Sequence, residues 1–199
     1  MGMPPACWKP VPGAILPAMH EDAEDPVAAT RRWLQRAVIG LNLCPFAKAV
    51  HVRNQVRYVL SEAATTAELL ADLTRELEFL QAADPAMVET TLLVHPRVLG
   101  DFLDYNDFLD DADAAVEALG LEGEIQVASF HPAYVFAGSD PDDPANCTNR
   151  SPFPMLHLLR EESVSRAVDA FPDPEAIVER NIETLERLGV DGFHRLLKP

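Results

Sequence analysis

Apolar and polar residues along the chain follow two different periods, and each period predicts one kind of secondary structure. Short runs that are alternating or continuously apolar, and rich in β-branched residues, are typical of strands. They cover residues 56–61, 89–95 and 124–130. Longer stretches repeat apolar residues every three or four positions and predict helices. The expected order of elements is α-β-α-β-α-β-loop-α-α.

Several of the predicted helices have a recognisable first or last residue. Asp25-Pro26, Thr65 and Asp101 are typical of helix N-termini. Gly189 is typical of a position where a helix ends. With these ends, the helical pattern covers the ranges 26–41, 65–80, 101–119, 155–160, 163–170 and 174–188.

Strands that alternate with helices are expected to pair in parallel through right-handed crossovers. We therefore expect an α/β (or α+β) fold with a small, mostly parallel sheet of about three or four strands. The alternative is a ferredoxin-like arrangement with antiparallel strands, which needs a fourth strand that the pattern does not locate. Prolines, glycines and an acidic run predict a loose tail over residues 1–25. A single α/β domain is expected over residues 26–199.

Composition narrows the classes of partner. The chain carries 16 Lys+Arg against 32 Asp+Glu, so its formal net charge is −16. This balance argues against binding to nucleic acid or to an anionic membrane, both of which attract clustered positive charge. The 3 cysteines have no paired metal-type spacing and predict no disulfide framework. The chain shows no long apolar run and no secretory signal, so a cytoplasmic protein is expected.

Two predicted strands end in the same dipeptide, His95-Pro96 and His131-Pro132. If these strands are parallel, both imidazoles emerge at the carboxyl edge of the sheet, which is where ligands bind in open α/β sheets. His131 is then a candidate acid/base catalyst with His95 beside it. The alternative is that each histidine is hydrogen-bonded and simply closes its strand, with the proline preventing extension.

The stretch from residue 132 to 152 has no periodicity, and a loop of this length is often functional. Arg150 comes just before Ser151-Pro152, which resembles the start of a helix. A guanidinium beside a helix N-terminus suits a carboxylate or phosphate, so Arg150, Asn149 and Ser151 are candidate substrate-binding residues. The alternatives are an ion pair between Arg150 and a loop aspartate, and an Asx-turn at Asn149.

Three further residues are weaker candidates. Cys44 precedes a proline on an extended turn and is a nucleophile if a histidine lies near it; otherwise it is a small buried residue. His157 is expected on the helix after the loop, and Asn106 borders the apolar stripe of the 101–119 helix. A divalent metal held by His95, His131 and His157, with Cys44 or an aspartate, is the alternative use of these side chains.

Four motifs resemble those of a bacterial family known only as a domain of unknown function. They are NLCPFA at 42–47, YNDFLD at 105–110, SFHP at 129–132, and TNRSP at 148–152 followed by His157. The similarity extends from about Thr30 to Leu188. The resemblance implies a small cytoplasmic protein and supplies no reaction.

These observations favour an enzyme that acts on a small anionic metabolite by hydrolysis or group transfer. Its site would lie at the carboxyl ends of the strands. No cofactor is predicted, because the chain has neither a Gly-x-Gly-x-x-Gly nor a Walker-type motif. Two other classes stay open, a metal-binding protein with His and Cys ligands and a non-catalytic module that binds a small ligand. The sequence leaves the substrate and the oligomeric state open.

Overall fold

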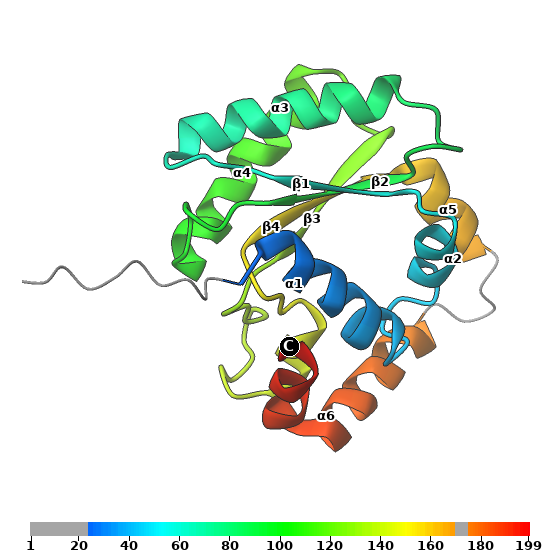
Figure 1. The fold of residues 1–199 in the computed structure, drawn as a ribbon, viewed down its shortest axis with the longest axis vertical. Helices are drawn as coiled ribbons and strands as arrows, with labels where there is room; N and C mark the ends of the chain where they lie inside the picture. The colour runs from blue at the N-terminus through cyan, green and yellow to red at the C-terminus, as the bar shows by residue number, and fades with distance from the viewer. Residues whose placement is uncertain (1–23, 170–174) are drawn as a thin grey trace, which may run out of the picture.

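A four-stranded sheet lies between two layers of helices in the computed structural model, which describes residues 24–169 and 175–199 (Figure 1). The strand order is β1-β2-β4-β3. β1 pairs with β2 in parallel, and β4 runs antiparallel to both β2 and β3. The strands are β1 (Val56–Leu60), β2 (Thr90–Val94), β3 (Ile125–Phe130) and β4 (Met155–Arg160).

The expected α/β class is confirmed, but the mostly parallel sheet is wrong. The residues of β4 were expected to form a helix, and they instead form a strand between β2 and β3. A run of six mainly apolar residues fits a helix and a buried strand about equally well. Because β4 is central, both of its faces meet helices, and the alternation that marks a half-exposed strand is absent.

Helices α3 (Thr66–Ala82) and α4 (Phe102–Ala118) cover one face of the sheet. Thr65 begins α3 with a reciprocal capping box that includes Glu68, and Asp101 caps α4 through its carboxylate. The predicted starts of both helices are therefore confirmed. Four leucines on one side of α3 are fully buried against this face, at positions 69, 73, 77 and 80.

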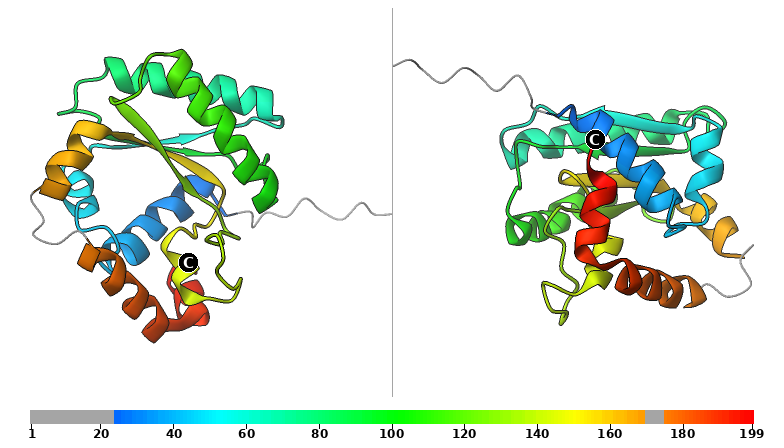
Figure 2. Two further views of the ribbon diagram at one scale, coloured as in Figure 1. Left: turned by 180° about the vertical axis from the view of Figure 1, so that it is seen from behind. Right: turned by 60° about the horizontal axis from the view of Figure 1, so that its bottom comes forward.

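The opposite face is covered by the N-terminal and C-terminal parts of the chain, as Figure 2 shows. α1 (Pro26–Trp33) continues into a π-helical segment, η1 (Leu34–Ile39), as the pattern over 26–41 predicted. α2 (Ala47–Val52), α5 (Glu161–Asp169) and α6 (Glu175–Leu197) complete this layer. Gly189 has a φ of 69° and kinks α6, so the predicted stop is a bend after which the helix continues.

The long loop between β3 and β4 is folded back by its own hydrogen bonds. It contains a 3₁₀ helix, η2 (Pro144–Thr148), which begins at Asp143 and packs against α6. In the part of the chain that the structure describes, no helix has the length and apolar character needed to cross a bilayer. The predicted tail falls almost entirely in residues 1–23, which lie outside the described residues.

Candidate functional site

His95 and His131 meet at one edge of the sheet, although the sheet is not parallel. β2 and β3 run in the same direction because β4 is antiparallel to both, so their carboxyl ends share an edge. Both imidazoles lie on the α3/α4 side, around the ring of Tyr105. The centroid of the Tyr105 ring is 5.8 Å from that of His95 and 5.1 Å from that of His131.

Backbone groups bond to both of these rings, although Nε2 of His95 has no partner. His95 Nδ1 lies 3.1 Å from the carbonyl oxygen of Val98, and His131 Nε2 lies 3.2 Å from that of Leu99. His131 Nδ1 accepts a hydrogen bond of 3.0 Å from the backbone N–H of Ala133. The two residues are 0% and 1% exposed. Burial lowers the pKa of His95 to about 4 and also lowers the pKa of His131, so both rings are neutral at pH 7.

Arg150 is not placed at a helix N-terminus, because the residues after Ser151 enter β4. Its Nε donates to the carbonyl of Tyr134 at 3.1 Å and its Nη2 donates to that of Pro141 at 2.6 Å. Its own carbonyl accepts a hydrogen bond from the indole of Trp33. The helix start predicted after Arg150 is therefore wrong, and binding of an anion by Arg150 stays a prediction. Arg150 holds the long loop together through backbone carbonyls.

The neighbouring candidates also make bonds within the loop. Asn149 Nδ2 donates to the carbonyl of Ser129 at 3.2 Å, and Ser151 Oγ donates to that of Phe153 at 2.7 Å. Asn106 is exposed on α4. Binding of substrate by these three residues stays a prediction, and the structure gives each of them a local or surface position.

His157 lies on β4 rather than on a helix, and this places it on the far face of the sheet. It pairs with Leu92 and Ala128, whereas Leu93 and Leu156 point to the α3/α4 side. His157 therefore faces away from His95 and His131, and the proposed metal site with three histidines is not assembled. Among the described residues, no group of three or more His, Cys, Asp or Glu side chains is placed to hold a metal ion.

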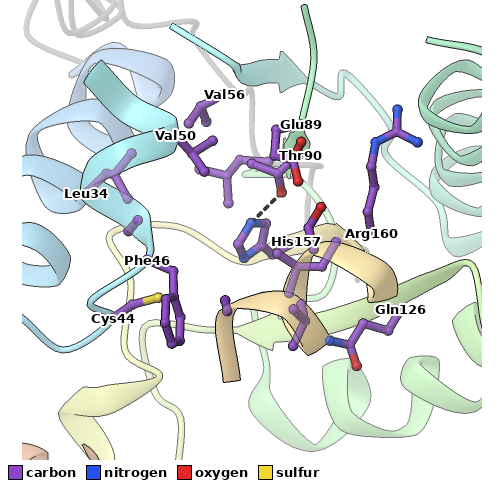
Figure 3. A pocket seen from close by; sticks show the side chains of 16 residues that line it. Leu34, Cys44, Phe46, Val50, Val56, Glu89, Thr90, Gln126, His157 and Arg160 are labelled. Carbon is purple, nitrogen blue, oxygen red and sulfur yellow. Dashed lines mark hydrogen bonds between the residues drawn. The ribbon is translucent and has the colours of Figure 1, made fainter. Parts of the chain in front are cut away.

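His157 instead lines a partly enclosed cavity of about 240 Å³ between the sheet and helices α2 and α5 (Figure 3). Cys44, in the turn that leads to α2, lines the same cavity. Two residues that the sequence singled out separately thus come together here. The walls are mostly apolar and comprise Leu34, Cys44, Phe46, Ala47, Val50, Val56, Glu89, Thr90, Leu92, Gln126, His157, Leu159, Arg160, Ser163, Val164 and Ala167.

The His157 ring is held by one hydrogen bond. Its Nε2 lies 2.7 Å from Oγ1 of Thr90, and this Oγ1 lies 2.6 Å from the carbonyl oxygen of Leu158. Burial in these apolar surroundings lowers the pKa of His157 to about 4. His157 is consequently a neutral side chain at pH 7 and cannot supply positive charge to the cavity.

The guanidinium of Arg160, which also lines the cavity, is hydrogen-bonded to backbone carbonyls. Its Nη2 donates to the carbonyls of Leu80 and Ala83 at 2.6 and 2.8 Å, where α3 ends. Cys44 is half-buried, and its thiol makes no hydrogen bond with any described residue. The cavity therefore offers a neutral imidazole and a thiol within mostly apolar walls, which also include Glu89, Gln126 and Ser163.

Most residues of this cavity were not predicted from the sequence. Thr90 opens β2 on the face of His157, and α2 and α5 bring Val50 and Val164 to the cavity. If residues 155–160 are treated as a strand, Met155, His157 and Leu159 share one face. On that reading His157 is a polar residue between two apolar ones, and this pattern would have pointed to the cavity.

Comparisons with known proteins agree with the resemblance noted above. The model of a family described as "Protein of unknown function (DUF1415)" matches residues 25–195. Neither the curated proteins nor the solved structures give a match to this chain. The family match extends over both helical layers and all four strands, so it includes every residue that lines the cavity.

Proposed function

Because the chain belongs to the DUF1415 family of proteins of unknown function, we propose its function from the site: it binds a small, largely apolar molecule in the cavity between the sheet and helices α2 and α5. Of the function classes open to the sequence, this is the non-catalytic module that binds a small ligand. Ligand sites are typically concave and apolar, with a few polar groups that orient the ligand.

The single observation that carries the proposal is the cavity of about 240 Å³. The cavity is partly enclosed and mostly apolar, and concave apolar sites of this kind are where small ligands bind. A void of about 150 Å³ accommodates benzene. The cavity therefore has room for one or two fused rings, or for a short acyl chain.

Charge favours a neutral ligand over the small anion that the sequence analysis expected. Arg160 lines the cavity but directs its Nη2 to backbone carbonyls at the end of α3, and His157 is neutral at pH 7. Glu89 also lines the cavity and repels an anion. The chain as a whole has a net charge of −16. Hydrolysis or group transfer on an anionic metabolite stays a prediction with weaker support.

Filling the cavity tests this function. Val50 lines the cavity, whereas Val52 on the same helix is 69% exposed, so Val50→Trp and Val52→Trp form a matched pair. We expect neutral aromatic fragments, among them indole, to bind the wild-type protein and the Val52→Trp variant alike. Val50→Trp should weaken binding by about tenfold or more, because the indole side chain occupies the ligand's space.

Calorimetric titration measures these affinities, and amide chemical shifts of the cavity residues identify the site. Circular dichroism of both variants checks that each is folded. Equal binding by the two tryptophan variants, or no binding of any neutral fragment to the wild type, would contradict the proposed function.

A further inference from the structure

The hydrogen atoms around His157 follow from the geometry of three groups. Thr90 Oγ1 carries one hydrogen, and it lies within hydrogen-bond distance of both Leu158 O and His157 Nε2. A carbonyl oxygen only accepts, so the threonine hydrogen is directed to Leu158. Thr90 Oγ1 then accepts from His157, which places the ring's hydrogen on Nε2.

This arrangement leaves Nδ1 as the acceptor of the ring. A neutral imidazole has one N–H, and that hydrogen is on Nε2, so Nδ1 presents a lone pair. No residue in the described ranges donates a hydrogen bond to Nδ1. Nδ1 of His157 is also not fully buried, so it is in contact with the cavity or with solvent. Figure 3 shows the ring among the apolar walls, bonded to Thr90 alone.

His95 provides a comparison within the same protein. Its Nε2 also lacks a partner, but that atom is fully buried and the residue is 0% exposed. His157 lines the cavity of about 240 Å³, whereas His95 does not. Of these two histidines, His157 is therefore the one whose acceptor nitrogen a small molecule can reach.

An acceptor in apolar surroundings discriminates between ligands. A ligand that lacks a donor leaves the lone pair of Nδ1 desolvated and unpaired, which costs about 1–3 kcal/mol. A carboxylate presents lone pairs to this nitrogen and cannot donate. A neutral N–H or O–H group satisfies it.

We propose that the cavity selects a neutral aromatic or heteroaromatic molecule that carries one N–H or O–H donor, and that this donor binds His157 Nδ1. Thr90 is the positioning residue, because its hydroxyl determines which nitrogen of His157 carries the hydrogen. This inference rests on the proposed function and names the class of ligand for the same cavity.

Indole and benzofuran provide the test. They have nearly the same shape, and benzofuran has a ring oxygen where indole has its N–H. We expect indole to bind the wild-type protein about tenfold more tightly, measured by calorimetric titration. His157→Phe keeps an aromatic ring and removes the acceptor, so it should bind the two molecules with similar affinity.

Thr90→Val is the second variant, and it keeps the shape of residue 90 while removing its hydroxyl. Without this acceptor for Nε2–H, the hydrogen can move to Nδ1, and the preference for indole should shrink. The ¹⁵N chemical shifts of His157 report the change directly. In the wild type Nδ1 should resonate as an unprotonated nitrogen, and in Thr90→Val its shift should move toward that of a protonated one.

The possible outcomes distinguish the proposed function from this inference. If neither these two molecules nor any other neutral fragment binds the wild type, the proposed function and this inference are both overturned. If other neutral fragments bind but indole does not, the inference alone fails. If both bind with equal affinity, the cavity binds apolar molecules but does not select a donor, and the inference alone fails. A preference for indole that persists in His157→Phe, or a protonated Nδ1 in the wild type, would also overturn it.

Discussion

The histidines on the two faces of the sheet differ in their hydrogen-bond partners. His95 and His131 each bond to a carbonyl of the segment that follows β2, at Val98 and Leu99. His157 bonds to Thr90 and keeps a second nitrogen for a ligand. A histidine at the end of a strand resembles a catalyst in sequence, but its role depends on whether a nitrogen that is free of backbone partners can be reached by a ligand, and Nε2 of His95 is fully buried.

Cys44 gives a prediction at the scale of one residue. Its thiol lines the cavity, so a bound molecule should shield it from a small neutral alkylating reagent such as iodoacetamide. We expect saturating indole to slow alkylation of Cys44 on the order of fivefold, measured by mass spectrometry of the peptide that contains it. Cys147 is 1% exposed and serves as the internal control, since it should react slowly in both conditions. An unchanged rate at Cys44 would place the ligand elsewhere.

At the scale of elements, β4 connects the two helical layers. It pairs with β2 on one side and β3 on the other, and it carries His157 toward the cavity and Leu156 and Leu158 toward α3 and α4. At its end, Arg160 bonds to the carbonyls where α3 finishes. A helix leaves its last carbonyls without partners inside the helix, so this arginine acts as a cap supplied by a distant strand.

Arg160→Met therefore tests the joint between β4 and α3. The variant keeps much of the side chain's apolar length, leaves the carbonyl of Ala83 without the Arg160 donor and leaves the carbonyl of Leu80 with only the backbone N–H of Ala83. We expect the free energy of unfolding to fall by about 2 kcal/mol. Arg75→Met on the surface of α3 is the control, because exposed ion pairs such as Arg75–Asp72 contribute about 0–1 kcal/mol. Urea denaturation measures both, and equal losses in the two variants would contradict the capping role.

At the scale of the whole molecule, each layer contains a histidine that burial keeps neutral. His95 lies beside α4 and His157 lies beneath α2 and α5, and the pKa of each is lowered to about 4. In the unfolded chain, a histidine titrates near its ordinary pKa of about 6.5. The unfolded state therefore binds protons that the folded state does not bind between these two values.

The contribution of each neutral histidine to the free energy of unfolding is therefore fully present above about pH 6.5. It is lost as the pH falls toward 4, because proton uptake favours the unfolded state. Between pH 7 and pH 5 each of these histidines should lower the free energy of unfolding by about 2 kcal/mol. His95→Gln should remove about that part of the pH dependence, measured by urea denaturation at both pH values. A full pH dependence in His95→Gln would show that this ring is not responsible.

Local patterns alone determined much of this protein. The caps Thr65 and Asp101, the apolar stripes behind them, and the first three strands are properties of short segments, and the structure contains them as predicted. The meeting of His95 and His131 at one edge was predicted from the sequence on one condition, which the sheet fulfils. It required only that β2 and β3 run in the same direction, which they do even with β4 inserted between them.

The tertiary structure alone decided where β4 lies and what surrounds His157. A run of six residues fits either period, and it became a strand because β2 and β3 both had edges to pair with it. As a residue of strand β4, His157 faces away from His95 and lines the same cavity as Cys44. The cavity is built from separate segments of the chain: η1 and α2 with the turn between them, the four strands, and α5. An empty space between such distant segments leaves no periodic signal in the sequence, because it depends on how their side chains pack.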